Sequence, residues 1–220
     1  MKNIIKKVVV GVVVVVVVGV GALYAVLPNT VFQHTAYTDE DFHIKTYKSR
    51  LDKDGDGIDD QTDILNNAKS YIATHPRYKS IYYPKTGYPD DNHGVCTDVV
   101  AFALKDAGYD LQELIDNDIH TRPYAYNVDK PDKMIDFRRV RNQLPYFKEH
   151  AINLTCDTSK IDQWCAGDIV VFHEHVAIVS DKRNSDGVPF IIHNANPFQL
   201  HLDEDALLLQ GRVLGHFRIS

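Results

Sequence analysis

An uninterrupted apolar run near the N-terminus limits what the first part of this chain can form. Val8 to Leu27 contains 20 residues without a charge, most of them valine. A helix of this length spans about 30 Å, which is the thickness of the hydrocarbon core of a bilayer. Because lipid offers the backbone no hydrogen-bond partner, a helix forms there even from valine. We therefore predict one transmembrane helix over residues 8–27.

Lysines precede this run at positions 2, 6 and 7. The positive-inside rule predicts a cytoplasmic tail over residues 1–7 and places the rest of the chain outside the cytoplasm, as a single-pass protein of the cell membrane. A cleaved signal peptide, followed by secretion, is the alternative. We favour the uncleaved anchor because the run exceeds a typical signal core and no small-x-small cleavage site follows it.

The charge of the chain excludes one class of partner. The chain has 24 basic and 30 acidic residues, and its first 27 residues hold three lysines and no acid. The remainder therefore has 21 basic against 30 acidic residues, a net charge of −9. A surface of this sign repels phosphate backbones, so we expect no nucleic-acid partner. Contact with the membrane is expected through the N-terminal helix.

A polar and aromatic segment, residues 28–50, is predicted to be a spacer. Residues 51–63 then place acids at positions 1, 3, 5 and 12 of a twelve-residue loop, with glycine at position 6. This spacing resembles an EF-hand calcium loop, in which a backbone carbonyl binds at position 7. No entering helix is evident and position 12 is aspartate rather than glutamate, so a solvated acidic turn is the alternative. We predict a structural Ca²⁺ site formed by Asp52, Asp54, Asp56, Ile58 and Asp63, and no organic cofactor.

Residues 64–220 are predicted to form one α+β domain. Apolar residues at helical spacing come first, and short β-rich runs separated by turn residues follow in the last third. This order of elements indicates helices packed on an antiparallel sheet. Helices are expected over residues 63–73, 94–108 and 109–120, strands over 167–172, 175–180, 189–193 and 213–219, a turn over 184–187, and a basic segment of mixed character over 121–150.

Three cysteines leave at least one free thiol, because disulfides use cysteines in pairs. Cys156 and Cys165 can form a pair or remain free, and Cys96 is the natural candidate for the free thiol in both cases. Cys96 lies at the start of the helix predicted over residues 94–108. Unpaired backbone N–H groups at a helix start favour a thiolate, which is the nucleophilic form of cysteine.

Two histidines are expected close to each other at the ends of neighbouring strands. His175 opens one predicted strand and His193 ends the next. Adjoining antiparallel strands bring such end residues together, so that one imidazole can hold the other. A nucleophilic thiol needs a base and a group that orients this base. The sequence therefore predicts a thiol and two imidazoles in one site.

The sequence contains four motifs in this order: Gly94-Val-Cys96-Thr97, Trp164-x-x-Gly167-Asp168-Ile-Val-Val, His175-Val-Ala-Ile-Val and Ile191-Ile-His193-Asn194-Ala195. In this order they resemble the NlpC-type and CHAP-type cysteine amidases and endopeptidases of bacterial cell walls. The stretch from about Asp54 to the C-terminus is similar to an uncharacterised bacterial domain family allied to them, in Asp136-Phe-Arg-Arg-Val and in the final Gly-His-Phe-Arg. The resemblance implies a papain-like fold, with the helix of the nucleophile packed on an antiparallel sheet.

This resemblance implies an extracytoplasmic cysteine hydrolase that cuts amide bonds in peptidoglycan stem peptides or in another peptide. Cys96 would attack the carbonyl, His175 would be the general base and acid, and His193 would orient His175. The backbone N–H of Cys96 would contribute to an oxyanion hole. Asn194 and Asn196 are alternatives for the third catalytic residue. The alternative function is a catalytically inactive domain that binds cell wall or protein on the same scaffold.

Structural interpretations of the same residues stay open. Cys96 can be an inert side chain, because free cysteines are commonly buried. His173 and His175 share a strand face and, with His93 or Cys96, could ligate zinc, although the spacing matches no familiar zinc pattern. The Arg138-Arg139-Arg141 cluster is expected to be solvated, or to meet a substrate carboxylate.

The sequence also departs from the NlpC pattern. Many members have aspartate before the cysteine and Ser-Gly after it, whereas Val95 precedes Cys96 here and Thr97-Asp98 follows. These differences leave the specificity for substrate undefined.

Overall fold

The computed structural model describes residues 35–219. The predicted cytoplasmic tail, the transmembrane helix and the first part of the predicted spacer lie outside these residues. Among the helices described, none has the length and apolar character needed to cross a membrane.

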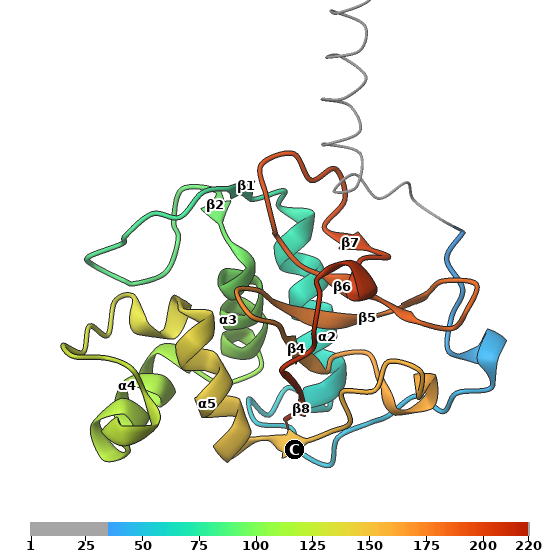
Figure 1. Cartoon of the computed structure of the whole chain (residues 1–220), viewed down its shortest axis with the longest axis horizontal. Coiled ribbons are helices and arrows are strands. Elements are labelled where there is room, and N and C mark those ends of the chain that lie inside the picture. Colours follow the sequence, from blue (N-terminus) through green and yellow to red (C-terminus); the bar gives the residue numbers. More distant parts are fainter. Residues whose placement is uncertain (1–34, 220) are drawn as a thin grey trace, which may run out of the picture.

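A six-stranded antiparallel sheet forms the centre of the domain, so the α+β architecture with an antiparallel sheet is confirmed (Figure 1). Its spatial order is β3-β8-β4-β5-β6-β7, which places the last strand of the chain beside β4. The sequence predicts the four inner strands but not the two edge strands, which have only two residues each. The strands are β3 (Ile152–Asn153), β4 (Ile169–Val171), β5 (Val176–Arg183), β6 (Pro189–Ile192), β7 (Asp203–Glu204) and β8 (Gly215–Arg218).

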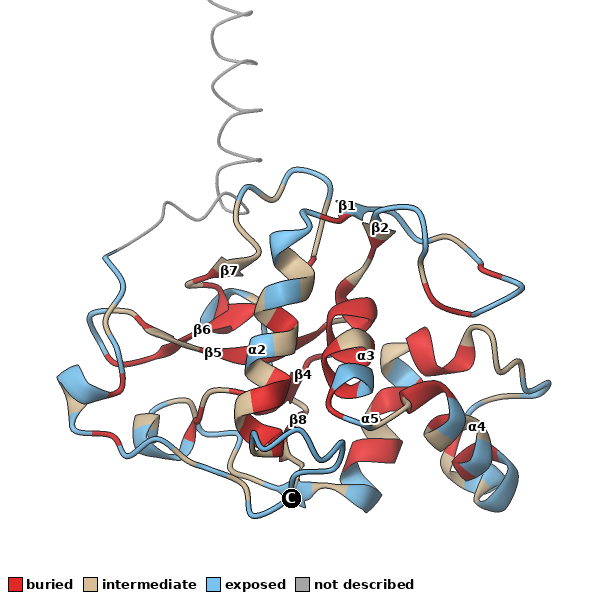
Figure 2. Ribbon diagram, turned by 180° about the vertical axis from the view of Figure 1, so that it is seen from behind, coloured by how far each residue is buried: buried red, intermediate tan, exposed pale blue. Residues whose placement is uncertain are grey.

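Both faces of the central strands are buried, and alternate residues pack into two different apolar clusters. In β5, Val176 and Ile178 face one cluster, and Ala177 and Val179 face the other. Helices α2 (Asp60–Ala73) and α3 (Cys96–Asp106) belong to the first cluster and lie side by side in front of the sheet in Figure 2. A strand that is dry on both faces is apolar along its whole length, which explains the continuous apolar runs of the sequence.

Two more helices, α4 (Leu111–Thr121) and α5 (Val140–His150), lie beside α3 (Figure 1). The pattern of the sequence predicts α4, but it does not predict α5, which has Pro145 inside it. The helix α5 forms nevertheless, because Phe147 is fully buried and its ring packs 5.8 Å from that of Phe217 in β8. Tertiary packing of this kind routinely overrides a weak local preference.

The remaining elements are short. Strands β1 (Arg77–Tyr78) and β2 (His93–Gly94) form a parallel pair that leads directly into α3. Between β5 and β6 the predicted turn is present, since the Gly187 N–H donates to the carbonyl of Asn184 at 3.0 Å. The 3-10 helices are η2 (Glu40–Phe42), η3 (Pro123–Ala125), η4 (Asp136–Arg138), η5 (Ile161–Gln163) and η6 (Leu207–Leu209).

The described part of the predicted spacer lies against the domain. Tyr37 exchanges two backbone hydrogen bonds of 2.8 Å with Arg183 at the end of β5. The guanidinium of Arg183 is buried and its Nε donates to Asp39 at 2.5 Å. Its other N–H groups reach the carbonyls of Ile161, Trp164 and Gly187.

Replacing this arginine should cost the domain much of its stability. Arg183→Ala leaves Asp39 as a buried carboxylate without its partner and removes the donors of three carbonyls. We expect the free energy of unfolding to fall by about 3–5 kcal/mol, measured by urea denaturation. The neighbouring Lys182→Ala is the control, because Lys182 forms a partly exposed pair with Asp203 and should cost at most about 1 kcal/mol. Equal losses in the two variants would contradict the structural role of Arg183.

Candidate active site

The helix that carries the cysteine begins at Cys96, as the sequence predicts. Its first turn is fixed by Asp98, whose carboxylate accepts the N–H of Val95 at 2.8 Å. This is one half of a capping box, in which the third helical residue reaches back to the residue before the helix. The position of Cys96 therefore depends on Asp98.

Asp98 is in turn held by a buried arginine. Arg138 donates to both carboxylate oxygens of Asp98, from Nε at 2.5 Å and from Nη2 at 2.9 Å, and both side chains are buried. Its Nη1 donates to the carbonyl of Ile81, and the hydroxyl of Thr97 donates to the Arg138 carbonyl. The expectation that Arg138 is solvated is wrong, because Asp98 supplies the charge that permits its burial.

Gly94 has a packing reason for lacking a side chain. A Cβ at this position would lie 2.2 Å from the hydroxyl of Tyr71 in α2. The space beside the loop before Cys96 is thus filled by a tyrosine of the same chain. A larger residue at position 94 would force the ring of Tyr71 to move.

The two histidines meet at the ends of a β-hairpin pair. His175 directly precedes β5 and His193 directly follows β6, so each lies one residue outside the strand in which the sequence predicts it. The pairing of Ile178 with Ile192 brings these ends together, and His175 Nε2 lies 2.7 Å from His193 Nδ1. His193, and neither of the two asparagines, is therefore the residue that contacts His175.

His175, His193 and a third ionisable side chain, Glu204, form a row of hydrogen-bonded groups. The sequence pattern does not reveal Glu204. Glu204 in β7 accepts from His193 Nε2 at 3.1 Å, and both side chains are buried. The strand that carries Glu204 has two residues and no recognisable β pattern. Only the pairing of β6 with β7 shows that position 204 lies beside His193.

The two asparagines after His193 have other contacts. The amide of Asn194 donates to the carbonyls of Pro76 and Gly94, so it ties β6 to the loop before the cysteine. Asn196 Oδ1 accepts the backbone N–H of Phe198 in a local turn.

The sulfur of Cys96 lies beside the start of β5. The side chain is only 8% exposed, and the backbone N–H groups of Val176, Thr97 and Cys96 lie close to the sulfur. Burial nevertheless raises the pKa of the thiol to about 11, because desolvation of a thiolate outweighs these N–H groups. The sequence predicts that the helix start favours the thiolate. This prediction is wrong for the resting state, because the net shift of the thiol pKa is upward.

Both histidines also rest uncharged. Burial and the neighbouring His193 lower the pKa of His175 to about 3, and burial lowers the pKa of His193 to about 3. Among the described residues, no hydrogen bond joins the sulfur of Cys96 to the ring of His175, and His175 Nδ1 has no hydrogen-bond partner. The resting site therefore holds a neutral thiol near the start of β5 and, at the residue directly before β5, a neutral imidazole with one ring nitrogen available.

Two hollows border these elements. One of about 370 Å³ is lined by residues that include Tyr78, His93 and Asn194. The other, of about 620 Å³, is lined by Arg139, Val140, Arg141, His173 and Glu174. The first touches the loop before Cys96 and the second touches the turn before His175, but neither lining includes Cys96 or His175.

Two of the motifs on which the resemblance rests stabilise the fold. Asp168 follows Gly167 and is fully buried, where it accepts hydrogen bonds from His216 Nε2 at 3.0 Å and from Arg218 Nε at 2.7 Å. The Gly-Asp motif and the final Gly-His-Phe-Arg motif are thus two parts of one ionic cluster between β4 and β8.

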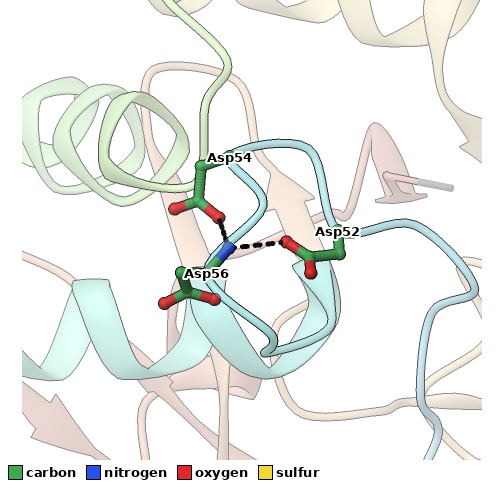
Figure 3. Close-up of side chains that lie close together, drawn as sticks. All are labelled: Asp52, Asp54 and Asp56. Carbon is green, nitrogen blue, oxygen red and sulfur yellow. Dashed lines mark hydrogen bonds between the residues drawn. The ribbon is translucent and has the colours of Figure 1, made fainter.

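The acidic loop gathers three of its predicted ligands. Carboxylate oxygens of Asp52, Asp54 and Asp56 lie within 4.8 Å of one another. Figure 3 shows the three side chains gathered in the loop. Ile58 is exposed, and Asp63 lies in the first turn of α2. Within residues 35–219 no other trio of His, Cys, Asp or Glu comes this close, so the geometry gives the zinc alternative at His173 and His175 no support.

The three cysteines are all free, and Cys156 is exposed whereas Cys165 is buried. The possible Cys156–Cys165 disulfide is therefore not formed.

The raised pKa of Cys96 can be measured directly. In a Cys156→Ser/Cys165→Ser background, we expect the rate of alkylation of Cys96 by iodoacetamide to rise only above the pKa of about 8.5 that free cysteine shows. Single-cysteine protein that keeps Cys156 instead is the control, because its thiol is exposed. A rate that already levels off near neutral pH would contradict the resting thiol and indicate a thiolate.

The comparisons with known proteins show a family but no activity. The chain is 35% identical over 169 residues to the uncharacterized protein YijF of Escherichia coli (strain K12), which covers 70% of this chain and 80% of that protein. No solved structure matches this chain significantly. Residues 65–219 match the family described as a domain of unknown function, DUF1287. The chain belongs to this family, DUF1287.

Proposed function

We propose that this protein is an extracytoplasmic cysteine hydrolase of papain-like type that cuts amide bonds of peptidoglycan stem peptides. Cys96 is the nucleophile, His175 the general base and acid, and His193 the residue that orients His175. The observation that carries the proposal is the 2.7 Å contact of His175 Nε2 with His193 Nδ1, beside a cysteine at a helix start. The buried helix on an antiparallel sheet supports the alliance with NlpC-type and CHAP-type enzymes.

The row of three side chains sets which nitrogen of His175 is free to act. The N–H at His193 Nε2 donates a hydrogen bond to an ionised Glu204, so His193 Nδ1 is unprotonated and accepts a hydrogen bond from the N–H at His175 Nε2. His175 Nδ1 then carries a lone pair and no proton. A base in this tautomer can accept a proton from the thiol of Cys96.

The chemical steps follow from this arrangement. As Cys96 attacks the amide carbonyl, its proton passes to His175 Nδ1 and a bond forms between sulfur and carbon. The oxyanion is stabilised by backbone N–H groups at the start of α3. The C–N bond then breaks, and the leaving amine takes the proton from His175. Water, deprotonated by the same nitrogen, hydrolyses the thioester and releases the carboxylic acid and the thiol.

The resting neutral pair fits this sequence of steps. Because the thiol and the imidazole are both uncharged, proton transfer accompanies attack instead of preceding it, as for a serine hydroxyl with its histidine. A substrate bound over the site would place its amide carbonyl next to the sulfur when the reaction takes place.

The class of substrate rests on two features. The predicted anchor would place the domain on the outer side of the membrane, where peptidoglycan lies. Arg139 and Arg141 line the hollow beside His173, where cationic groups suit the free carboxylates of stem peptides.

A non-catalytic wall-binding domain is the second candidate. Its support is the burial of Cys96 at 8% exposure, together with the raised pKa of the thiol. Buried free cysteines are often inert.

Replacing the nucleophile separates the two candidates. Cys96→Ala should lower the release of muropeptide fragments from purified sacculi by more than about 1,000-fold, measured by chromatography of soluble products. Cys156→Ala should retain activity, because Cys156 is exposed and outside the site. Identical product traces for wild type and Cys96→Ala would eliminate the hydrolase and leave the binding domain.

Glu204 gives the activity a pH dependence. Burial raises the pKa of Glu204 to about 7, with His201 lowering it and Asp203, which pairs with Lys182, raising it. The ionised form accepts from His193, whereas the protonated form donates to it and reverses the tautomer of His175. We therefore expect kcat to rise with pH through about 7.

Glu204→Gln tests this role. It should lower kcat by roughly 10- to 100-fold and remove the rise near pH 7, because an amide does not titrate. Glu149→Gln, at an exposed position of α5, should keep the wild-type profile. A rise near pH 7 that persists in Glu204→Gln would assign it to another group.

A further inference from the structure

We propose that the loop of residues 52–63 binds one Ca²⁺ ion through the carboxylates of Asp52, Asp54, Asp56 and Asp63 and the carbonyl of Ile58, and that the bound ion stabilises the domain. This site lies at the start of α2 and at the end of α3, away from the first turn that carries Cys96. The proposal is independent of the hydrolase function.

The loop already has the curvature that brings its acids together. Gly55 and Gly57 have φ angles of 79° and 95°, which other residues rarely adopt. The carboxylate of Asp52 accepts the backbone N–H groups of Gly55, Asp56 and Gly57 at 2.8–3.1 Å. Figure 3 shows the side chains of Asp52 and Asp54 turned toward the N–H of Asp56. The chain is therefore shaped before any ion enters.

Asp63 supplies the second observation. Its side chain belongs to a residue that is 5% exposed, yet its carboxylate has no hydrogen-bond or ion-pair partner among the described residues. Asp63 lies in the first turn of α2, directly after the loop, and the carboxylates of Asp56, Asp54 and Asp52 are the nearest charges that act on it. A buried carboxylate without a partner is costly unless a cation is supplied.

Two neighbouring acids of the segment have partners in the fold, which sets Asp63 apart from them. Asp59 caps α2 and accepts the N–H of Ser49 and the hydroxyl of Thr62. Asp60 accepts the N–H of Lys53 at 2.7 Å and the hydroxyl of Tyr109. Both carboxylates are used by the fold, and Asp63 is not.

The ligand chemistry selects calcium among common cations. All the donors are carboxylate or carbonyl oxygens, which hard cations prefer over zinc or copper. Ca²⁺ takes six to eight oxygens in flexible geometry, whereas Mg²⁺ needs a near-octahedral set at shorter distance. Three of the carboxylates are exposed, so water can complete the shell.

Binding at this place would stabilise the contact of α2 with α3. A Cβ on Gly108, after the end of α3, would lie 3.2 Å from the backbone nitrogen of Asp54, so the loop packs directly on that turn. Ile64 and Ala68 of α2 are fully buried in the same core as α3. An ion that joins Asp54 to Asp63 therefore links the end of one helix to the start of the other.

The test uses thermal unfolding of the full chain. Adding about 5 mM CaCl₂ to protein treated with EDTA should raise Tm by several degrees and give a heat of binding for one ion by calorimetry. The same concentration of MgCl₂ should give a smaller shift. No heat and no shift with CaCl₂, or equal shifts with both salts, would overturn the proposal.

Substitution of Asp63 gives opposite effects in the two conditions. Asp63 is buried beside three other carboxylates that repel it, so Asp63→Asn should raise Tm in EDTA. The same variant should lose the response to CaCl₂. Asp54→Asn should also lose the response, and Asp116→Asn, at a helix position outside the loop, should keep it. A full response in Asp63→Asn would exclude Asp63 as a ligand.

None of these measurements uses hydrolysis. An inactive protein that still responds to CaCl₂ would contradict the proposed function alone, and an active protein without the response would contradict the calcium site alone.

Discussion

The buried ion pair between Asp98 and Arg138 is the interaction on which the candidate site depends. Taking two charges out of water costs several kcal/mol per ion, and only a well-matched geometry offsets this. Here the guanidinium contacts both carboxylate oxygens, and the remaining N–H reaches a carbonyl near residue 81. The pair thereby joins α3, η4 and the loop before β2. Loss of either partner would release the turn that places Cys96.

The sheet fixes the other half of the site. β5 lies between β4 and β6, is buried on both faces, and holds His175 directly before its first residue. The two-residue turn of His173 and Glu174 closes on the hydrogen bond between the Phe172 N–H and the His175 carbonyl. The direction of the His175 ring is then set by His193, which directly follows β6. A rigid hairpin is a more accurate mount for a base than a loop.

Local patterns in the sequence predict much of this arrangement. They place Cys96 at a helix start, the four inner strands, the turn at residue 184 and the meeting of two histidines. They do not predict α5, because Pro145 and polar residues hide a helix that forms through Phe147. They also miss Glu204 and the burial of Arg138, because both depend on partners distant in the chain. Local patterns also do not predict the direction in which the thiol pKa shifts, because burial of the sulfur is a property of the packed domain.

The placement of Glu204 on β7 has a consequence for motion. β7 has two residues at the margin of the sheet, and no strand of the described chain lies beyond it. Hydrogen bonds at such a margin open more often than those at the centre, because few contacts must be broken. Fraying of β7 would separate the carboxylate from His193 while both imidazoles stay in place on the inner strands. The carboxylate of Glu204 can thus separate from His193 on a faster timescale than that on which the rest of the site unfolds.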